Sequence, residues 1–204
     1  MKIAIIDYGM GNLRSVEKAF EHVGASGAFV TDDPAAVRTA DKAVLPGDGA
    51  FDATMDRLRE SGVADVVKEF AASGRPFLGI CVGMQCLLTS SDEGRQGVVG
   101  LDLVPGRVRR FSGGDGLKVP QIGWNELQFP APSPLFQGLN AADMVYFLHS
   151  FYCVPADPAT VTATANYGLD YCAGLQAGNI FATQFHPEKS GQVGLAILRN
   201  FSRL

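Results

Sequence analysis

The sequence predicts an α/β fold: a three-layer, doubly wound and mostly parallel sheet, with antiparallel strands added in the C-terminal half. Before residue 90, short apolar runs alternate with segments whose apolar residues recur at helical spacing, as in parallel-sheet proteins. Glycine-containing turns follow several of these runs. From residue 101 the runs are shorter and partly alternating, which is typical of antiparallel strands.

The elements of the first half follow from these patterns. A helix at 13–23 ends at Gly24, a residue type that favours helix C-termini. Asp33 and Pro34 have the residue types that begin a short helix. We expect further helices at 51–58, 63–72 and 82–88, and strands at 2–7, 28–30, 43–45 and 77–80.

The second half is predicted to contain short strands and one closing helix. Gly, Pro and Asp separate the short runs, so each run reads as one strand. The last segment carries Val193, Ile197 and Leu198 at helical spacing. We expect strands at 104–110, 118–122, 126–129, 145–148, 160–167, 171–176 and 180–185, and a helix at 191–201.

Composition limits the classes of protein that fit. The chain has 204 residues, 47% hydrophobic and 19% charged, which suits one domain over residues 1–204 with a substantial core. A net charge of −4 gives no reason to expect a nucleic-acid partner. No apolar run approaches the ~20 residues of a membrane helix. The apolar start is interrupted at Asp7, too early for a signal peptide, so we expect a cytoplasmic protein.

The four cysteines do not form a metal-binding pattern. There is no Cys-x-x-Cys spacing and the chain has 3 histidines, so we expect neither a zinc site nor a cofactor. Cysteines of a cytoplasmic protein are expected to be reduced. Cys86, Cys153 and Cys172 are interpreted as packing residues.

Cys81 stands at the end of a predicted buried strand. Gly79 and Gly83 flank it two residues away on each side, the thiol counterpart of a nucleophile elbow. Such a turn presents the sulfur at the carboxyl end of the strand. The following helix places Cys81 near a helix N-terminus, which favours thiolate. Taken alone, the segment fits an ordinary buried thiol equally well.

His186 and Glu188 form a second group of chemically active residues. His186 precedes Pro187, which favours an extended backbone. Side chains two residues apart in an extended chain point to the same side, so Glu188 can reach the His186 ring. A carboxylate there fixes the imidazole tautomer and leaves the other nitrogen to take a proton from a thiol.

The loop at 46–51 is a third group. Because carboxyl ends of parallel strands meet at one edge of a sheet, Gly47 and Gly49 are expected beside Cys81. Backbone amides of such a loop can form an oxyanion hole, although a plain strand-to-helix turn has the same pattern.

Gly-Ile-Cys-Val-Gly-Met-Gln at 79–85 and Gln-Phe-His-Pro-Glu-Lys-Ser at 184–190 resemble the class I (triad) glutamine amidotransferases. The resemblance covers essentially the whole chain and implies one flavodoxin-like domain. It assigns a catalytic triad to Cys81, His186 and Glu188, and the oxyanion hole to backbone amides of residues 47–49 (Gly47, Asp48, Gly49) and Val82. Asp48 departs from the family's usual Pro-Gly-Val-Gly, and we expect its side chain to point away from the site.

The same resemblance implies residues for the glutamine substrate. Glu93 falls where the family places a carboxylate for the α-amino group, which suits an ammonium ion. Gln85 matches a residue close to the substrate. The backbone at His149, Ser150 and Phe151 matches the segment that holds the substrate carboxylate.

Two further motifs resemble the glutaminase subunits of imidazole glycerol phosphate synthases, from histidine biosynthesis. Residues 120–125 resemble Pro-His-Met-Gly-Trp-Asn, with Gln121 in place of His, and residues 146–151 resemble Tyr-Phe-Val-His-Ser-Tyr, with Phe151 in place of Tyr. The resemblance implies a heterodimer with a (β/α)8-barrel cyclase subunit. Its expected interface residues are Asn12, Trp124, Tyr146 and Lys189, although Trp124 could equally be a core residue.

The implied reaction is glutamine hydrolysis through a cysteine thioester, with ammonia passed to the cyclase, which makes imidazole glycerol phosphate and AICAR. The chain has no P-loop and no basic cluster for a phosphorylated substrate, which agrees with a second chain. Three alternatives remain: the glutaminase of another synthase, such as the pyridoxal phosphate synthase; a thiol hydrolase or peptidase; and a non-catalytic binding subunit. A Gly-Gly-Glu-Ser signature at residues 46–49 would favour the glutaminase of the pyridoxal phosphate synthase. This chain lacks that signature.

Overall fold

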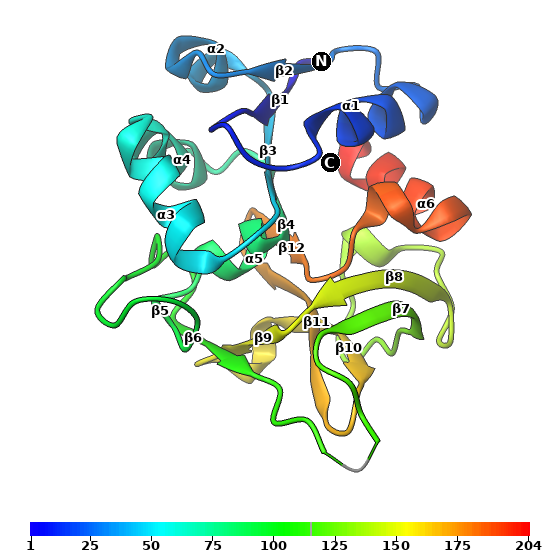
Figure 1. The fold of residues 1–204 in the computed structure, drawn as a ribbon. Helices are drawn as coiled ribbons and strands as arrows, with labels where there is room; N and C mark the ends of the chain where they lie inside the picture. Colours follow the sequence, from blue (N-terminus) through cyan, green and yellow to red (C-terminus); the bar gives the residue numbers. More distant parts are fainter. Residues whose placement is uncertain (115) are drawn as a thin grey trace.

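The computed structural model describes residues 1–114 and 116–204. Its main sheet has the strand order β2-β1-β3-β4-β12-β11-β9-β6-β5, with β10 paired to β11, and β7 and β8 form a separate two-stranded sheet (Figure 1). The strands are β1 (Ile3–Ile6), β2 (Ala28–Thr31), β3 (Lys42–Gly47), β4 (Phe77–Cys81), β5 (Ser90–Ser91), β6 (Gly106–Arg110), β7 (Gln121–Glu126), β8 (Met144–His149), β9 (Phe151–Pro155), β10 (Val161–Asn166), β11 (Asp170–Ala177) and β12 (Ile180–Thr183).

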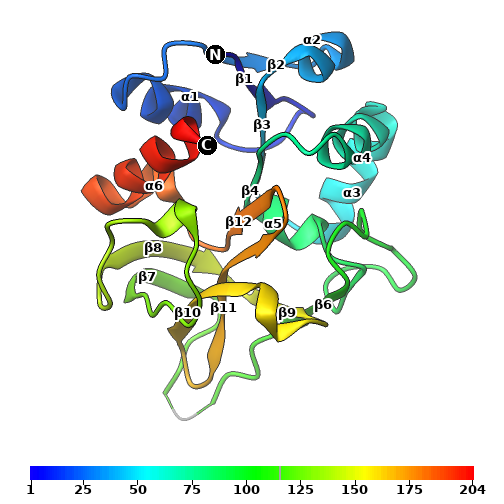
Figure 2. The same cartoon turned by 180° about the vertical axis from the view of Figure 1, so that it is seen from behind.

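Helices cover both faces of the parallel part of the sheet, which gives the predicted three layers. In Figures 1 and 2, α1 and α6 lie on one face, and α2, α3 and α4 lie on the other. The helices are α1 (Leu13–His22), α2 (Pro34–Thr39), α3 (Phe51–Glu60), α4 (Val63–Ala72), α5 (Val82–Cys86) and α6 (Gly191–Arg203). The prediction of an α/β fold with a mostly parallel sheet is therefore confirmed.

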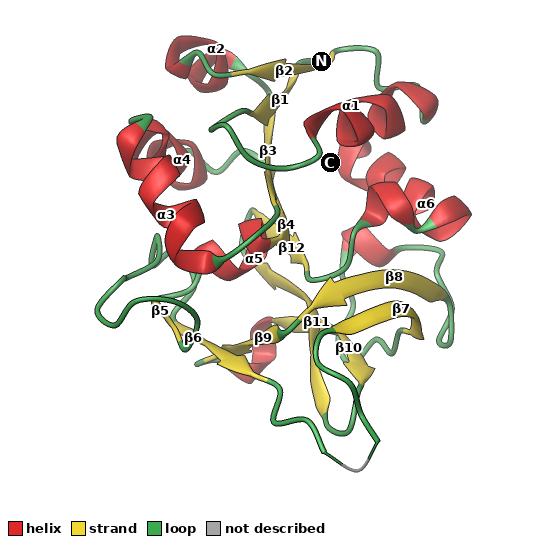
Figure 3. Ribbon diagram, in the orientation of Figure 1, coloured by secondary structure: helices red, strands yellow, loops and turns green. Residues whose placement is uncertain are grey.

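Burial explains why the parallel strands are the most apolar parts of the chain. Every residue of β1, β3, β4 and β12 is buried, because helices pack on both faces of these strands. β1, β2, β3, β4 and β12 pair in parallel, and β11, β9 and β6 continue the sheet with antiparallel pairs. The shorter, partly alternating apolar runs after residue 101 belong to this antiparallel part (Figure 3).

Helix starts follow the expected capping chemistry. Asn12 caps α1, with its side chain accepting a hydrogen bond from the Ser15 amide. Asp33 caps α2 in the same way, and Pro34 begins that helix. Most predicted boundaries agree to within a few residues, but α5 ends at Cys86, before the expected residue 88.

Two predictions in the antiparallel part are wrong. Residues 118–122 and 126–129 do not form separate strands, because one strand, β7, runs through Gln121–Glu126. Pro120 cannot donate to a strand ladder, so the strand starts after it, and pairing with β8 extends it through polar residues. The strand β9 was not predicted, because residues 151–155 follow β8 after a single bend and join the main sheet through β6 and β11.

Candidate active site

A cavity of about 230 Å³ lies at the carboxyl ends of β3 and β4. The two strands are in register with Gly47 opposite Cys81, so the loop after β3 and the turn after β4 share one edge of the sheet, as predicted. The next parallel strand, β12, leads into His186. The lining residues are Asp48, Gly49, Cys81, Val82, Gln85, Glu93, Pro120, Leu148, His149, Ser150 and Phe151.

Cys81 occupies a sharp turn between β4 and α5. Its φ of 55° and ψ of −112° place a non-glycine residue in a sparsely populated backbone region. Such strain is typical of residues that a fold holds in place for chemistry. The side chain is mostly buried and lines the cavity, so the sulfur faces the space that a substrate would enter.

Glycine is required where this turn meets the β3 loop. A Cβ atom on Gly83 would lie 2.0 Å from the Leu45 carbonyl oxygen, and one on Gly47 would lie 2.4 Å from the Gly83 amide nitrogen. Real Cβ atoms do not approach backbone so closely. The two glycines therefore bring the loop of residues 47–49 against the Cys81 turn.

His186 and Glu188 form a buried pair. The Nδ1 atom of His186 lies 2.8 Å from Oε1 of Glu188, and the two side chains are 3% and 2% exposed. A carboxylate only accepts, so Nδ1–H is the donor and Nε2 is left for the thiol. Burial lowers the pKa of His186, but the adjacent Cys81 sulfur and the Glu188 carboxylate outweigh it and raise the pKa to about 10.

Neighbouring backbone holds the His186 main chain in place. Its amide donates to the Tyr146 carbonyl oxygen of β8 at 3.1 Å. The Ser190 hydroxyl donates to the His186 carbonyl oxygen at 2.6 Å and accepts a hydrogen bond from the Tyr146 amide at 3.0 Å. The main chain of His186 is thus tied directly to strand β8.

Glu93 is one of the residues that line the cavity. Its carboxylate accepts a hydrogen bond of 2.9 Å from the Phe51 amide, the first amide of α3, which has no side-chain N-cap of its own. Burial raises the pKa of Glu93, and this amide opposes the shift. One partly desolvated carboxylate therefore faces the cavity, as a site for an ammonium group requires.

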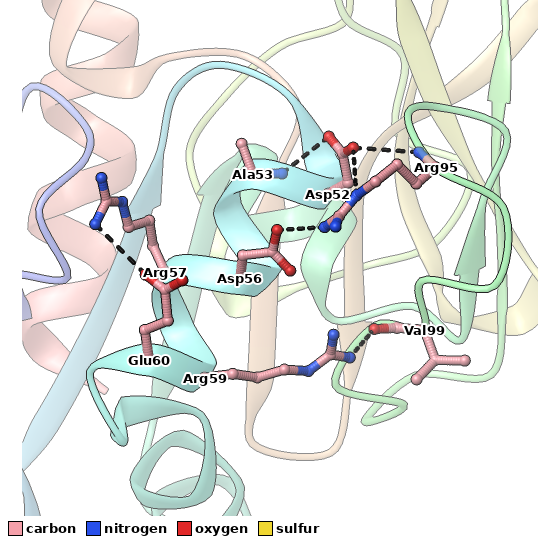
Figure 4. Close-up of polar contacts among 8 residues, drawn as sticks. All are labelled: Asp52, Ala53, Asp56, Arg57, Arg59, Glu60, Arg95 and Val99. Carbon is pink, nitrogen blue, oxygen red and sulfur yellow. Dashed lines mark hydrogen bonds and ion pairs between the residues drawn. The ribbon is translucent and has the colours of Figure 1, made fainter.

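The loop that carries Glu93 is fastened to α3 by ion pairs. Arg95 contacts Asp52 and Asp56, and Arg59 donates to the Val99 carbonyl oxygen (Figure 4). Individually, exposed pairs of this kind contribute little to stability. Together they set the position of the loop, and with it that of Glu93, relative to α3.

The segment at residues 149–151 also lines the cavity. The Phe151 carbonyl oxygen accepts hydrogen bonds from Nδ1 of His149 at 2.7 Å and from the Gln85 side-chain amide at 3.2 Å. Burial lowers the pKa of His149 to about 4, so its ring is neutral at physiological pH. Gln85 thereby joins the elbow helix α5 to the segment that was expected to hold the substrate carboxylate.

The expected orientation of Asp48 is wrong. Its side chain does not point away from the site: it lines the cavity, and Oδ1 lies 3.7 Å from Nε2 of His186. Asp48 lies in the turn between β3 and α3, and the sequence pattern carries no information on the direction of its side chain.

Two residues near Cys81 had not been assigned a role. Gln184 is buried, and its side-chain amide lies 3.8 Å from the Cys81 sulfur and 3.2 Å from the Gln85 amide. Gln184 precedes His186 by two residues and Glu188 by four. In an extended chain the three side chains point to the same side, which is the signal that could have identified Gln184. The buried Tyr8 hydroxyl donates to the Pro46 carbonyl oxygen at 2.7 Å, and no sequence motif pointed to this contact.

The expected interface residues gather around the sheet formed by β7 and β8. Trp124 and Tyr146 face each other across it, with ring centroids 6.1 Å apart. Trp124 is 53% exposed, so it is not a core residue. The turn at Pro187–Lys189 packs against both β8 and α1, whose N-cap is Asn12, so the four expected residues lie in one region of the surface.

Other kinds of site receive no support within residues 1–114 and 116–204. In this part of the chain the structure brings together no group of three or more His, Cys, Asp or Glu residues able to hold a metal ion. None of the helices described there is both long and apolar enough to cross a membrane.

Comparison with known proteins identifies the family. Residues 4–203 match the model of the class-I glutamine amidotransferases, and the chain belongs to this family. The names of similar proteins are more specific than the family, because they specify one enzyme subunit. The chain is 56% identical to "Imidazole glycerol phosphate synthase subunit HisH" of Syntrophotalea carbinolica, with 98% of each chain covered. It is 51% identical to the protein of the same name from Geobacter sulfurreducens, with 100% of this chain and 99% of that one covered.

Solved structures agree with the family at the level of the fold. One described as a glutamine amidotransferase superposes with a TM-score of 0.75 at 18% identity, with both chains fully covered. PurLQS from Thermotoga maritima gives a TM-score of 0.70 at 19% identity, with 98% of this chain and 96% of that chain covered.

Proposed function

We propose that this chain is the glutaminase subunit of an imidazole glycerol phosphate synthase. It hydrolyses glutamine to glutamate and ammonia, and it does so as one domain over residues 1–204 in the cytoplasm. The observation that carries the proposal is the arrangement at the cavity, where Cys81 lines the space and adjoins His186, whose Nδ1 lies 2.8 Å from Glu188. This order of sulfur, imidazole and carboxylate suits a thiol nucleophile.

In the proposed reaction the Cys81 sulfur attacks the side-chain amide carbon of glutamine. His186 delivers the proton at Nε2 to the amide nitrogen, which leaves as ammonia, and a glutamyl thioester remains on the sulfur. His186 then takes a proton from water, which attacks the thioester and releases glutamate. Glu188 keeps Nδ1 protonated and stabilises the imidazolium in both steps.

Backbone amides and cavity residues supply the rest of the site. The oxyanion of each tetrahedral intermediate is stabilised by amides of residues 47–49 and Val82, which meet at the turn that Gly83 permits. Glu93 binds the α-ammonium group, and the backbone of residues 149–151 holds the α-carboxylate. The hydrogen bonds of Gln85 and His149 to Phe151 support this assignment, because they fix the segment before substrate arrives.

Ammonia is consumed by a second subunit, the (β/α)8-barrel cyclase. The outer face of the β7–β8 sheet supports a docking role because it is apolar and exposed: Ile122 is 62% exposed and Trp124 is 53% exposed. The proposed contacts include Asn12, Tyr146 and Lys189 beside Trp124. The His186 main-chain amide donates to the Tyr146 carbonyl oxygen of the same sheet, so docking takes place one hydrogen bond away from the main chain of His186.

The test is glutamate release from glutamine, measured with and without the cyclase subunit and its nucleotide. We expect low activity alone and strong stimulation by the loaded partner. Cys81→Ser should abolish release, whereas Cys172→Ser, which alters a buried thiol of β11, should not. Release that persists in Cys81→Ser would refute the nucleophile, and hydrolysis of peptides but not free glutamine would refute the function.

A further inference from the structure

The Asp48 side chain lies where the proposed mechanism has no use for it. Its Oδ1 atom is 3.7 Å from Nε2 of His186, and its carboxylate lines the cavity together with Cys81. Nδ1 of His186 is already bonded to Glu188, so Nε2 is the ring atom that must exchange the proton with sulfur and with the leaving ammonia. Asp48 therefore lies beside the one imidazole atom that performs proton transfer.

The Cys81 sulfur is the other group on the Nε2 side of the ring. Among the side chains of residues 1–114 and 116–204, Nε2 of His186 is buried and has no partner within normal hydrogen-bond geometry. The charged or titratable groups around the ring are Cys81, Glu188, His149 and Asp48. Asp48 is the anion on the Nε2 side that belongs neither to the nucleophile nor to the Nδ1 pair.

The loop that carries Asp48 is held at both ends. Before it, the Tyr8 hydroxyl donates to the Pro46 carbonyl oxygen, and burial raises the pKa of Tyr8, so the phenol keeps its donor proton. After it, the Phe51 amide is bonded to Glu93. The placement of the carboxylate is thus set by a fixed loop, although the Asp48 side chain itself is 39% exposed.

A carboxylate in this place opposes the reaction in two ways. It attracts the Nε2 proton of the imidazolium, which the reaction must give to the departing amine. It also puts negative charge next to the site where the oxyanion develops, where a donor is needed instead.

We propose that Asp48 is a resting-state latch: in the glutamine-free chain its carboxylate pairs with His186 at Nε2 and restrains catalysis until the side chain turns away from the ring. The proposal rests on the proposed glutaminase function. It assigns to Asp48 an inhibitory role in the isolated chain, in addition to the contribution of its backbone amide to the oxyanion hole.

Asp48→Asn and Asp48→Val test the latch, and Asp32→Asn, on the exposed loop before α2, is the control for an equal change of net charge. We expect both Asp48 variants to raise kcat of the chain without partner by about fivefold, the change that ~1 kcal/mol of lost attraction produces. The stimulation by the loaded cyclase, which is the ratio of the activities with and without it, should fall in both Asp48 variants, because the latch is already released in the loaded complex. Asp32→Asn should behave as wild type in both assays.

A second measurement does not depend on glutaminase activity. In the glutamine-free chain, NMR titration of the His186 imidazole should show a pKa lower by about 0.7 in Asp48→Asn than in wild type, equivalent to the same ~1 kcal/mol. An unchanged His186 pKa, or a kcat without partner that stays the same or falls in both variants, would overturn the latch. A wild-type chain that releases no glutamate even with the cyclase overturns the proposed function, whereas the titration still decides whether Asp48 and His186 interact.

Discussion

Replacing Glu188 with glutamine tests the proposed triad most directly. The substitution keeps the size of the side chain and removes its charge at a place where the carboxylate and His186 are both almost fully buried. An amide can donate to Nδ1 as well as accept from it. The variant therefore admits the tautomer with the proton on Nε2, which cannot take a proton from Cys81.

The structure gives the size of the expected effect. The pair is a charge-assisted hydrogen bond of 2.8 Å, shielded from water. Such bonds contribute roughly 1.5–3 kcal/mol, and each ~1.4 kcal/mol corresponds to a factor of ten in rate, so we expect kcat to fall about 10- to 150-fold. Glu188 does not line the cavity, so KM for glutamine should change little.

The assay is steady-state glutamate release in the presence of the loaded cyclase subunit. Glu60→Gln is the matched control, because Glu60 lies at the exposed end of α3 and pairs only weakly with Arg57 (Figure 4). A thermal unfolding curve for each variant separates lost catalysis from lost folding. A fall in kcat of less than about threefold in folded Glu188→Gln would contradict the role given to the carboxylate.

Three further predictions concern packing, docking and pH. Gly83→Ala, whose Cβ would lie 2.0 Å from the Leu45 carbonyl oxygen, should lower the free energy of unfolding by about 1–3 kcal/mol; an unchanged denaturation midpoint would contradict the packing. Trp124→Ala should weaken cyclase binding about 30-fold (~2 kcal/mol) in calorimetry without altering thermal stability, and equal affinity would rule out the proposed surface. The pKa of His186 is raised from 6.5 to about 10, so its stabilising contribution is fully present below pH 6.5 and is lost as the pH rises toward 10. Denaturation at pH 6.5 and 9.5 should show this loss in wild type but not in His186→Asn.

The sequence predicted the parallel half of the fold well because its strands are buried on both faces. Runs such as Ile3–Ile6 and Phe77–Cys81 are apolar throughout, and glycines and caps mark the turns between them. In the antiparallel half one face of many strands is exposed, and the pattern is weaker. β7 was split into two strands and β9 was missed, because pairing with distant strands decided their limits.

The residues of the candidate site divide in the same way. Cys81, His186 and Glu188 could be found from sequence because each lies in a short motif with a local geometric meaning. Gln184, Tyr8 and the orientation of Asp48 could not be found in this way. Their contacts join residues more than 35 positions apart, and no local pattern records them.

Local sequence patterns predict the order of strands and helices in the parallel half, the family, and the motifs that contain Cys81, His186 and Glu188. They do so because these features depend on neighbours a few positions away, through backbone sterics and side-chain periodicity. The approach of the Asp48 carboxylate to Nε2 of His186 is a property of the folded chain alone, since it depends on how the β3 loop, the β4 turn and the segment after β12 pack at one edge of the sheet. Side-chain direction in a packed turn is set by contacts that the chain makes only after folding.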